Sequence, residues 1–248
     1  MIEMREVTKS YGQTAAVSGL TMTVEDGDIL GVFGANGAGK STLLRMLAGV
    51  LKPDGGSVRI DGADPERDWG SKETVFFLPD EQHFDAGETV RATARFYARF
   101  YRSFDREVFA RLCESFELRQ ADKISRLSKG MKKQVMMITA ISVRPKYILL
   151  DEVFDGIDSI SKQTLKNALL RLSAEYGTTV VTASHNIREI EDVCRSVCLL
   201  YKSKLVLHRK TDELKSAHEA EGGEVGLEEI LTKELEAQGY AGKNIDFI

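Results

Sequence analysis

GANGAGKS, residues 34–41, is the most informative stretch of this 248-residue chain. It fits the pattern GxxxxGK[ST], in which glycines let backbone N–H groups converge on phosphate oxygens at the N-terminus of a helix. The pattern assigns Lys40 to the β- and γ-phosphates and Ser41 to Mg²⁺. The flanking residues favour this interpretation over a flexible Gly-rich turn, because they predict a strand over 28–33 and a helix over 40–49. The predicted nucleotide contacts of the loop are Gly34, Asn36, Gly37, Ala38, Gly39, Lys40, Ser41 and Thr42.

A second informative stretch is YILLDE, residues 147–152. Its unbroken apolar run predicts a buried strand, which delivers two carboxylates at its C-terminal end. Asp151 fits the acid on the Mg²⁺ side of nucleotide hydrolases, and Glu152 fits the general base that acts on the attacking water. Acidic residues often follow strands, so the pair is weak evidence alone. Together with the phosphate loop upstream, it predicts a hydrolytic site.

The rest of the chain predicts an α/β fold. Residues 84–143 have helical character and no strong strand signal, so a helical subdomain interrupts an alternation of strands and helices. Further helices are expected at 161–176 and 187–193. Strands are expected at 2–9, 17–25, 28–33, 58–60, 74–78, 147–150, 178–183, 196–200 and 204–208.

The charge of the chain is unevenly distributed. Residues 211–248 hold 10 Asp and Glu against 3 Lys and Arg, a balance of −7; since the whole chain is at −4, residues 1–210 carry +3. No basic stripe of the kind that binds nucleic acid is present, so we expect no nucleic-acid partner. Within the acidic tail, residues 227–237 predict a solvated amphipathic helix, and a regulatory segment is the alternative.

Other features point to the cytoplasm. No apolar run approaches the roughly 18 residues that a membrane-spanning helix needs, and residues 1–7 lack a signal-peptide core. The three cysteines, Cys113, Cys194 and Cys198, do not form a disulfide framework. We expect them to be small buried hydrophobes in a reducing compartment; zinc binding by Cys194 and Cys198 is the alternative.

Taken together, these motifs resemble the nucleotide-binding cassette of ABC transporters, over residues 1 to about 210. LSKGM, residues 127–131, stands where the family has LSGGQ, about two dozen residues before the second acid. The resemblance implies that Ser128 and Gly130, at the start of a helix, meet the γ-phosphate held by the other subunit. Free N–H groups and the positive end of a helix dipole suit that role. An ordinary N-capped helix is the alternative.

The same resemblance assigns three further features. DGID, residues 155–158, is similar to the family's D-loop. His185, directly after the strand expected at 178–183, matches the switch histidine that binds the γ-phosphate and orients the water beside Glu152. Tyr11, after the first strand, matches the aromatic residue that stacks on adenine. A structural histidine and an ordinary aromatic residue are the alternatives.

The sequence departs from the family pattern at several positions. Asp80 stands where the Q-loop normally has Gln, and Gln82 follows two residues later. An aspartate can bind Mg²⁺ but adds negative charge beside the phosphates, so its role as a phosphate sensor is in doubt. Lys129 replaces a Gly, Met131 a Gln and Val153 a Pro of the family. The predicted metal ligands are therefore Ser41, Asp151 and Asp80.

Phe96, Tyr97, Phe100 and Tyr101 form i,i+4 aromatic pairs on a predicted helix. The resemblance places this region opposite the transmembrane partner. A stripe of this kind also fits a helix that packs into the core, which is the more common case.

The resemblance implies a P-loop NTPase core with a mixed sheet, an antiparallel β subdomain and an inserted helical subdomain. The cassette would cover residues 1–210, with its helical part near 84–143, and an acidic, partly helical tail would cover 211–248. The implied cofactors are ATP and Mg²⁺. The implied partners are a second cassette, as a homodimer or heterodimer, and a separate transmembrane permease that holds the chain at the inner face of the membrane.

Several motifs are similar to those of cassettes in the ABC-2-type export branch. They are LSKGM, DEVFDGID at 151–158, SHNIREIED at 184–192 and the stretch from 227 to about 240. One alternative is a non-transport ABC ATPase that acts on ribosomes or DNA; a single cassette without sustained heptads disfavours it. Another is a small-molecule P-loop kinase, which has no need for the Ser128–Gly130 segment or His185.

Overall fold

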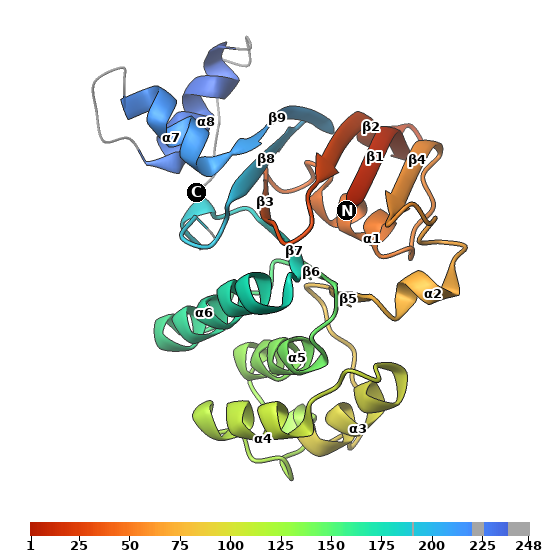
Figure 1. The fold of residues 1–248 in the computed structure, drawn as a ribbon, viewed down its shortest axis with the longest axis vertical. Helices are drawn as coiled ribbons and strands as arrows, with labels where there is room; N and C mark the ends of the chain where they lie inside the picture. Colours follow the sequence, from red (N-terminus) through yellow and green to blue (C-terminus); the bar gives the residue numbers. More distant parts are fainter. Residues whose placement is uncertain (190, 220–225, 238–248) are drawn as a thin grey trace.

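The computed structural model describes residues 1–189, 191–219 and 226–237. Its centre is a six-stranded sheet with the order β5-β6-β7-β3-β8-β9 (Figure 1). Neighbouring strands run parallel except for the last pair, which is antiparallel. The inner strands are buried along their whole length, as their unbroken apolar runs predict. The strands are β3 (Ile29–Phe33), β5 (Val75–Leu78), β6 (Tyr147–Asp151), β7 (Thr179–Ser184), β8 (Ser196–Tyr201) and β9 (Lys204–Lys210).

A second, antiparallel sheet has the order β2-β1-β4. It consists of β1 (Ile2–Tyr11), β2 (Thr14–Val24) and β4 (Gly55–Ile60). The inward-facing residues of these strands share a hydrophobic core with α1 (Lys40–Leu47) and with one face of the large sheet. Helix α1 is therefore held between the two sheets, and the loop before it is fixed at their junction.

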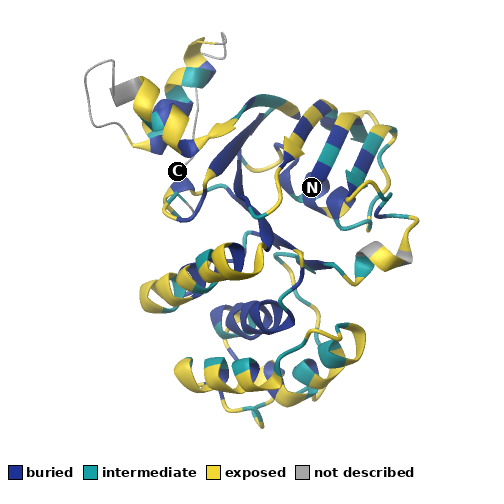
Figure 2. Ribbon diagram, in the orientation of Figure 1, coloured by how far each residue is buried: buried dark blue, intermediate teal, exposed yellow. Residues whose placement is uncertain are grey.

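Helices form the lower part of the molecule in Figure 1. They are α3 (Val90–Phe100), α4 (Arg106–Ser115), the 3₁₀ turn η1 (Ile124–Arg126), α5 (Lys129–Val143) and α6 (Ser159–Tyr176); the short α2 (Trp69–Lys72) lies apart from them, next to β5. Helix α5 is the most buried of them, as Figure 2 shows, because α3, α4 and α6 all pack against it. Its apolar residues extend almost all round the helix, the pattern of a helix enclosed by others.

The mixed sheet, the antiparallel sheet and the inserted helices confirm the predicted fold class. The helix expected over 187–193 is reduced to the 3₁₀ turn η2 (Ile187–Glu189). Val193 and Cys194 are buried in the core just before β8, so the chain turns back into the sheet there. All three cysteines are free and buried. Across the described ranges, no helix is both long and apolar enough to cross a bilayer.

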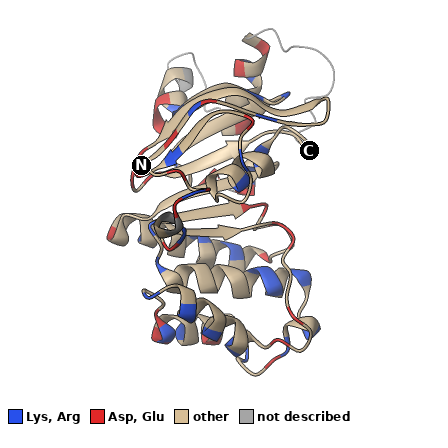
Figure 3. Ribbon diagram, turned by 90° about the vertical axis from the view of Figure 1, so that its right-hand side faces the viewer, with Lys and Arg blue, Asp and Glu red and all other residues tan. Residues whose placement is uncertain are grey.

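Two helices, α7 (Thr211–Glu219) and α8 (Leu227–Leu235), follow β9. Helix α7 was not anticipated from the sequence. The expectation that α8 is solvated is wrong for one of its faces, because Leu227, Ile230, Leu231 and Leu235 are buried in the main core cluster. Acidic residues mark the opposite faces of these helices, at the top of Figure 3. Residues 238–248 of the predicted tail, including Gly239 and Tyr240, lie outside the described residues.

Candidate nucleotide-binding site

The loop at 34–39 joins the end of β3 to the start of α1. Gly39 has a φ of 108°, and a Cβ atom there would lie 2.1 Å from the carbonyl oxygen of Ala16, so only glycine fits. Gly39 is the N-cap of α1 and offers no side chain that could accept from the first N–H groups of the helix. These N–H groups are therefore available to an anion, which is the condition for phosphate binding at a helix start.

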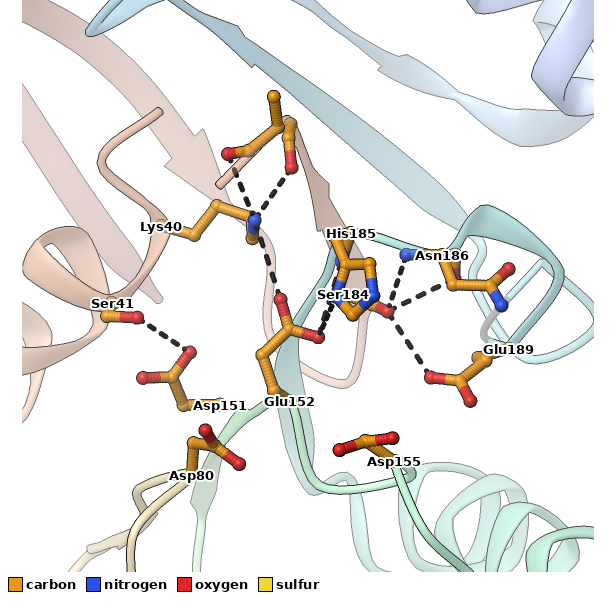
Figure 4. Close-up of polar contacts among 12 residues, drawn as sticks. Lys40, Ser41, Asp80, Asp151, Glu152, Asp155, Ser184, His185, Asn186 and Glu189 are labelled. Carbon is orange, nitrogen blue, oxygen red and sulfur yellow. Dashed lines mark hydrogen bonds and ion pairs between the residues drawn. The ribbon is translucent and has the colours of Figure 1, made fainter. Parts of the chain in front are cut away.

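Lys40 is the first residue of α1, and its side chain bends back over the loop (Figure 4). Its buried ammonium donates to the carbonyl oxygens of Gly34 at 2.6 Å and Ala35 at 3.3 Å, and lies 3.5 Å from Oε1 of Glu152. Burial lowers the pKa of Lys40, while the charges of Glu152 and Asp151 oppose that shift. The Lys40 ammonium thus lies near the free N–H groups at the start of α1. A positive charge there favours the binding of a phosphate.

Ser41 and Asp151 form the second contact of the site. The Ser41 hydroxyl donates to Oδ1 of Asp151 at 3.0 Å. Burial raises the pKa of Asp151, and the nearby charges of Glu152 and Asp80 add to the shift, while the Ser41 hydrogen bond and Arg45 oppose it. A cation bound here would relieve that unfavourable burial of negative charge, so the two oxygen donors fit Mg²⁺.

The described residues contain no group of three His, Cys, Asp or Glu side chains that could enclose a metal ion. Two protein oxygens are nevertheless sufficient for Mg²⁺ in nucleotide sites, because this ion keeps several waters and takes phosphate oxygens as further ligands. The donor set therefore fits a nucleotide-bound Mg²⁺ better than a metal held by protein alone.

Glu152 directly follows β6, and its side chain points toward Lys40 and His185 (Figure 4). Its backbone has a φ of 49°, which turns the side chain out of the strand direction. Oε2 of Glu152 lies 2.9 Å from Nδ1 of His185 and accepts a hydrogen bond from the His185 backbone N–H at 3.3 Å. His185 reaches this position because β7 ends at Ser184, whose hydroxyl accepts from the N–H of Asn186 at 3.0 Å and turns the chain. Lys40, Glu152 and His185 therefore form one connected group (Figure 4).

Ser128 and Gly130 lie at the start of α5, away from this group. The Ser128 hydroxyl accepts from the N–H of Met131 at 3.1 Å, which is the N-cap that the sequence predicts. A Cβ atom on Gly130 would lie 2.2 Å from the carbonyl oxygen of Gly156, so this glycine allows α5 to pack on the predicted D-loop. Lys129 pairs loosely with Asp155 of the same loop, at 3.5 Å. Within one chain, this segment contacts the D-loop.

Two other predicted site residues, Tyr11 and Asp80, have surroundings of their own. Tyr11 ends β1, and half of its surface is exposed, so its ring is accessible for stacking on a base. Asp80 follows β5, and its Oδ1 accepts from Nζ of Lys133 at 2.8 Å. Its role as a metal ligand stays a prediction. Sequence reasoning missed Lys133, and no local signal distinguishes it from the neighbouring Lys132, because both precede the apolar part of the helix.

The predicted aromatic stripe divides between two environments. Tyr97 and Tyr101 pack on the buried ring of Phe76, with ring centroids 5.2 and 5.7 Å away. Phe96 and Phe100 contact each other on the exposed side of α3. Beside them lies a cavity of about 590 Å³, lined among others by Gln82, Phe84, Phe96, Tyr97 and Met136. The interpretation that the stripe packs into the core is therefore right for Tyr97 and Tyr101 and wrong for the two exposed phenylalanines.

Comparison with known proteins agrees with this geometry. A family model described as "ABC transporter" matches residues 17–155. The ABC transporter ATP-binding protein YtrB of Bacillus subtilis is 29% identical over 218 residues, which are 88% of this chain and 75% of that protein.

Solved structures support the fold. The ATP-binding subunit of an ABC transporter superposes with a TM-score of 0.84 at 22% identity, covering 94% of this chain and 99% of the other. A bacterial ABC transporter cassette solved as a dimer gives 0.76 at 23% identity, with 85% and 99% covered. Because the family model spans more than half of the sequence and the fold is that of these cassettes, the chain belongs to the ABC transporter family, among its ATP-binding subunits.

Proposed function

We propose that this chain binds Mg-ATP, hydrolyses it, and uses the reaction to drive a separate membrane permease. The observation that carries the proposal is the convergence of Lys40, Asp151, Glu152 and His185 on the uncapped start of α1. When bound, Mg-ATP supplies the transferable phosphoryl group, and its metal ion offsets the charge of the phosphate oxygens.

The residues of the chain have separate roles in this proposal. The loop N–H groups and the Lys40 ammonium bind the phosphates and stabilise the negative charge of the transition state. Ser41 and Asp151 hold the metal ion through their oxygens. Glu152 accepts the proton of the attacking water, and His185, 2.9 Å from the Glu152 carboxylate, orients that water and keeps the carboxylate in place.

A complete site needs a second cassette. Ser128 and Lys129 are exposed at the start of α5, where the positive end of the helix dipole suits a nucleotide held by another subunit, while Gly130 packs on the D-loop of its own chain. We therefore propose that ATP is enclosed between two cassettes, either two copies of this chain or this chain and a related one, with Tyr11 against the adenine ring.

The exposed phenylalanines beside the 590 Å³ cavity are the proposed contact with the permease. The side-chain amide atoms of Gln82 are buried there and have no hydrogen-bond partner among the described residues. Buried amides normally have partners, so a polar group of the permease that enters the cavity would supply one. Docking at this place would hold the chain at the inner face of the membrane.

We further propose that the permease exports its substrate. The proposal rests on the motifs at 127–131, 151–158 and 184–192, which resemble those of ABC-2-type exporters. The relatives do not indicate the direction of transport, because they include both an export and an import protein. They are the Nod factor export ATP-binding protein I of Rhizobium meliloti, at 31% identity, and the sulfate/thiosulfate import ATP-binding protein CysA of Bradyrhizobium diazoefficiens, at 30%.

Substitution of Lys40 tests the proposal. We expect Lys40→Ala to abolish tight Mg-ATP binding and to lower hydrolysis by at least about 10²-fold, because the ammonium no longer offsets the phosphate charge. Lys233→Ala removes a lysine from an exposed pair on α8 and should change neither property. Wild-type affinity and turnover in Lys40→Ala would exclude this site. Copurification of the native chain with a membrane permease would then separate a transporter from a kinase or a ribosome-acting ATPase.

A further inference from the structure

Lys133 lies on α5, and its side chain is only 1% exposed. Its ammonium reaches two oxygen atoms from two other segments. It donates to Oδ1 of Asp80, in the loop after β5, at 2.8 Å, and to the backbone carbonyl oxygen of Glu152, after β6, at 2.6 Å. Both distances are those of short, charge-assisted hydrogen bonds. One buried cation therefore joins the helical part of the molecule to the loop after β5 and to the proposed general base.

The contact with Asp80 explains why an aspartate is tolerated near the phosphates. The Asp80 side chain is 42% exposed and lies beside Asp151, so it is close enough to act on the proposed nucleotide site (Figure 4). An isolated carboxylate there would repel ATP. The Lys133 ammonium at 2.8 Å neutralises it, and in return Asp80 supplies the partner that a buried ammonium requires.

The hydrogen bond from Lys133 to the carbonyl oxygen of Glu152 helps to hold the backbone conformation of Glu152. A φ of 49° is sparsely populated for a residue with a side chain and persists only where neighbouring groups hold it. The Glu152 N–H donates to the carbonyl oxygen of Ala183 at 3.0 Å, and its own carbonyl oxygen accepts from Lys133. Both backbone polar groups of this residue are therefore fixed, and the direction of its carboxylate follows from them.

We propose that Lys133 is a positioning residue with two separable effects, one on nucleotide affinity and one on turnover. Its charge neutralises Asp80 and so preserves ATP affinity. Its hydrogen bond to the carbonyl oxygen of Glu152 holds the general base in the reactive direction and so preserves kcat. The second effect rests on the proposed hydrolysis; the first needs only ATP binding.

Two variants separate the effects. In Lys133→Met, the unpaired Asp80 should raise the Kd for ATP about tenfold, an electrostatic cost of one nearby like charge. The released Glu152 should lower kcat by about 10²-fold, the usual cost of a misplaced catalytic group. Adding Asp80→Asn to Lys133→Met removes the repulsive charge, so ATP affinity should return to near the wild-type value while kcat stays low.

A third variant tests rescue. In the double variant Asp80→Asn with Lys133→Arg, the guanidinium is long enough for its N–H groups to replace the ammonium as donors to both oxygens. We expect it to regain at least tenfold in kcat over the double variant with methionine. ATP affinity is measured directly with a fluorescent nucleotide, kcat from phosphate release, and folding from thermal unfolding.

A matched pair elsewhere in the chain provides the control. Lys166 on α6 is 8% exposed and pairs with Asp192, which is 47% exposed, at 2.8 Å. Lys166→Met should lower thermal stability to a similar extent and leave ATP affinity and kcat unchanged. The proposal is overturned if Lys133→Met behaves like Lys166→Met, or if Asp80→Asn fails to restore affinity. A wild-type chain that binds ATP without hydrolysing it would refute the proposed function, and the affinity measurements would still decide the role of the charge.

Discussion

At the scale of single residues, the carboxylate of Glu152 has two different neighbours. One oxygen faces the ammonium of Lys40 at 3.5 Å, and the other faces His185 at 2.9 Å. A general base must be free of a permanent cation when it takes a proton. Bound phosphate would attract the Lys40 ammonium away from Glu152, which leaves the carboxylate between His185 and the water.

Substitution of Glu152 should separate hydrolysis from binding. Glu152→Gln keeps the shape and hydrogen bonding of the side chain but cannot accept a proton, so hydrolysis should fall by roughly 10²–10⁴-fold while ATP binding is kept. Loss of a negative charge beside the phosphates should also prolong the ATP-bound dimer. Phosphate release, nucleotide affinity and dimer lifetime measure these effects. Hydrolysis at the wild-type rate would mean that another residue, Asp80 or His185, is the base.

Asp151 predicts a dependence of stability on pH. Because its pKa is raised in the folded chain, the folded state binds this proton more tightly than the unfolded state does. The ionised carboxylate therefore lowers stability as the pH rises through the folded pKa, and the effect is absent below the unfolded value of about 3.8.

We accordingly expect Asp151→Asn to raise the melting temperature of the nucleotide-free chain at neutral pH, by an amount that shrinks as the pH falls. The same variant should bind Mg-ATP more weakly, because an amide is a poorer ligand for Mg²⁺. Thermal unfolding at several pH values between about 5 and 8, with and without Mg-ATP, checks both. A variant that is less stable than wild type at every pH contradicts the account.

At the scale of elements, α5 combines three features. Ser128 and Lys129 at its start are exposed, Lys133 donates to the carbonyl oxygen of Glu152, and its apolar surface forms the centre of the helical part. The apolar stretch predicted a helix here, and the Ser128 cap predicted where it begins. The contacts of Lys133 were not predictable, because they depend on two loops that are far away in sequence and that only the folded chain brings together.

The other elements show the same difference between what a local pattern predicts and what only the folded chain reveals. Unbroken apolar runs located the strands of the large sheet within a few residues, since burial on both faces leaves a clear pattern. The pattern of α8 indicated one apolar face, but no local rule reveals which surface of the molecule that face covers. At the site, a known pattern predicted the phosphate loop and the two acids, whereas the contacts of Lys133 with Asp80 and Glu152 follow only from the folded chain.

Ser128 belongs to an element that we expect to act across subunits. Ser128→Arg should leave ATP binding by the monomer nearly unchanged and block ATP-dependent dimerisation, because the guanidinium and its bulk fill the space meant for the partner's γ-phosphate. Light scattering in a Glu152→Gln background measures the dimer. Thr89→Arg disturbs the N-cap of α3 in the same way and should not affect it. A normal ATP-induced dimer in Ser128→Arg would contradict the signature assignment.

At the scale of the whole molecule, the C-terminal helices are part of the main body. Arg188, just after His185, pairs with Glu228 of α8 at 3.1 Å, and Glu191 accepts from the backbone N–H of Leu227 at 3.2 Å. The apolar face of α8 joins the core cluster under the large sheet. The segment that follows His185 therefore lies directly against the C-terminal helices. The division at residue 210 between a cassette and an acidic tail stays a proposal, and the apolar packing of α8 crosses it.

Truncating a side chain on α8 should show this dependence. Ile230 is fully buried, and we expect Ile230→Ala to cost about 2–5 kcal/mol of unfolding free energy, the range for removing buried methyl groups. Glu229→Ala, on the exposed face of the same helix, removes only a surface pair with Lys233 and should cost less than about 0.5 kcal/mol. Urea unfolding measures both. Equal effects of the two substitutions would show that α8 is not integrated into the fold.

The way Lys40 folds back on its own loop has a consequence for selectivity. Its ammonium has three oxygen partners within the chain, so an anion must compete with them for it. A small anion such as free phosphate offers little beyond what it displaces. A nucleoside triphosphate also contacts the N–H groups at the start of the helix, and it brings a metal ion and a base that make further contacts. We therefore expect the contacts of Lys40 within its own chain to favour a nucleoside triphosphate over free phosphate.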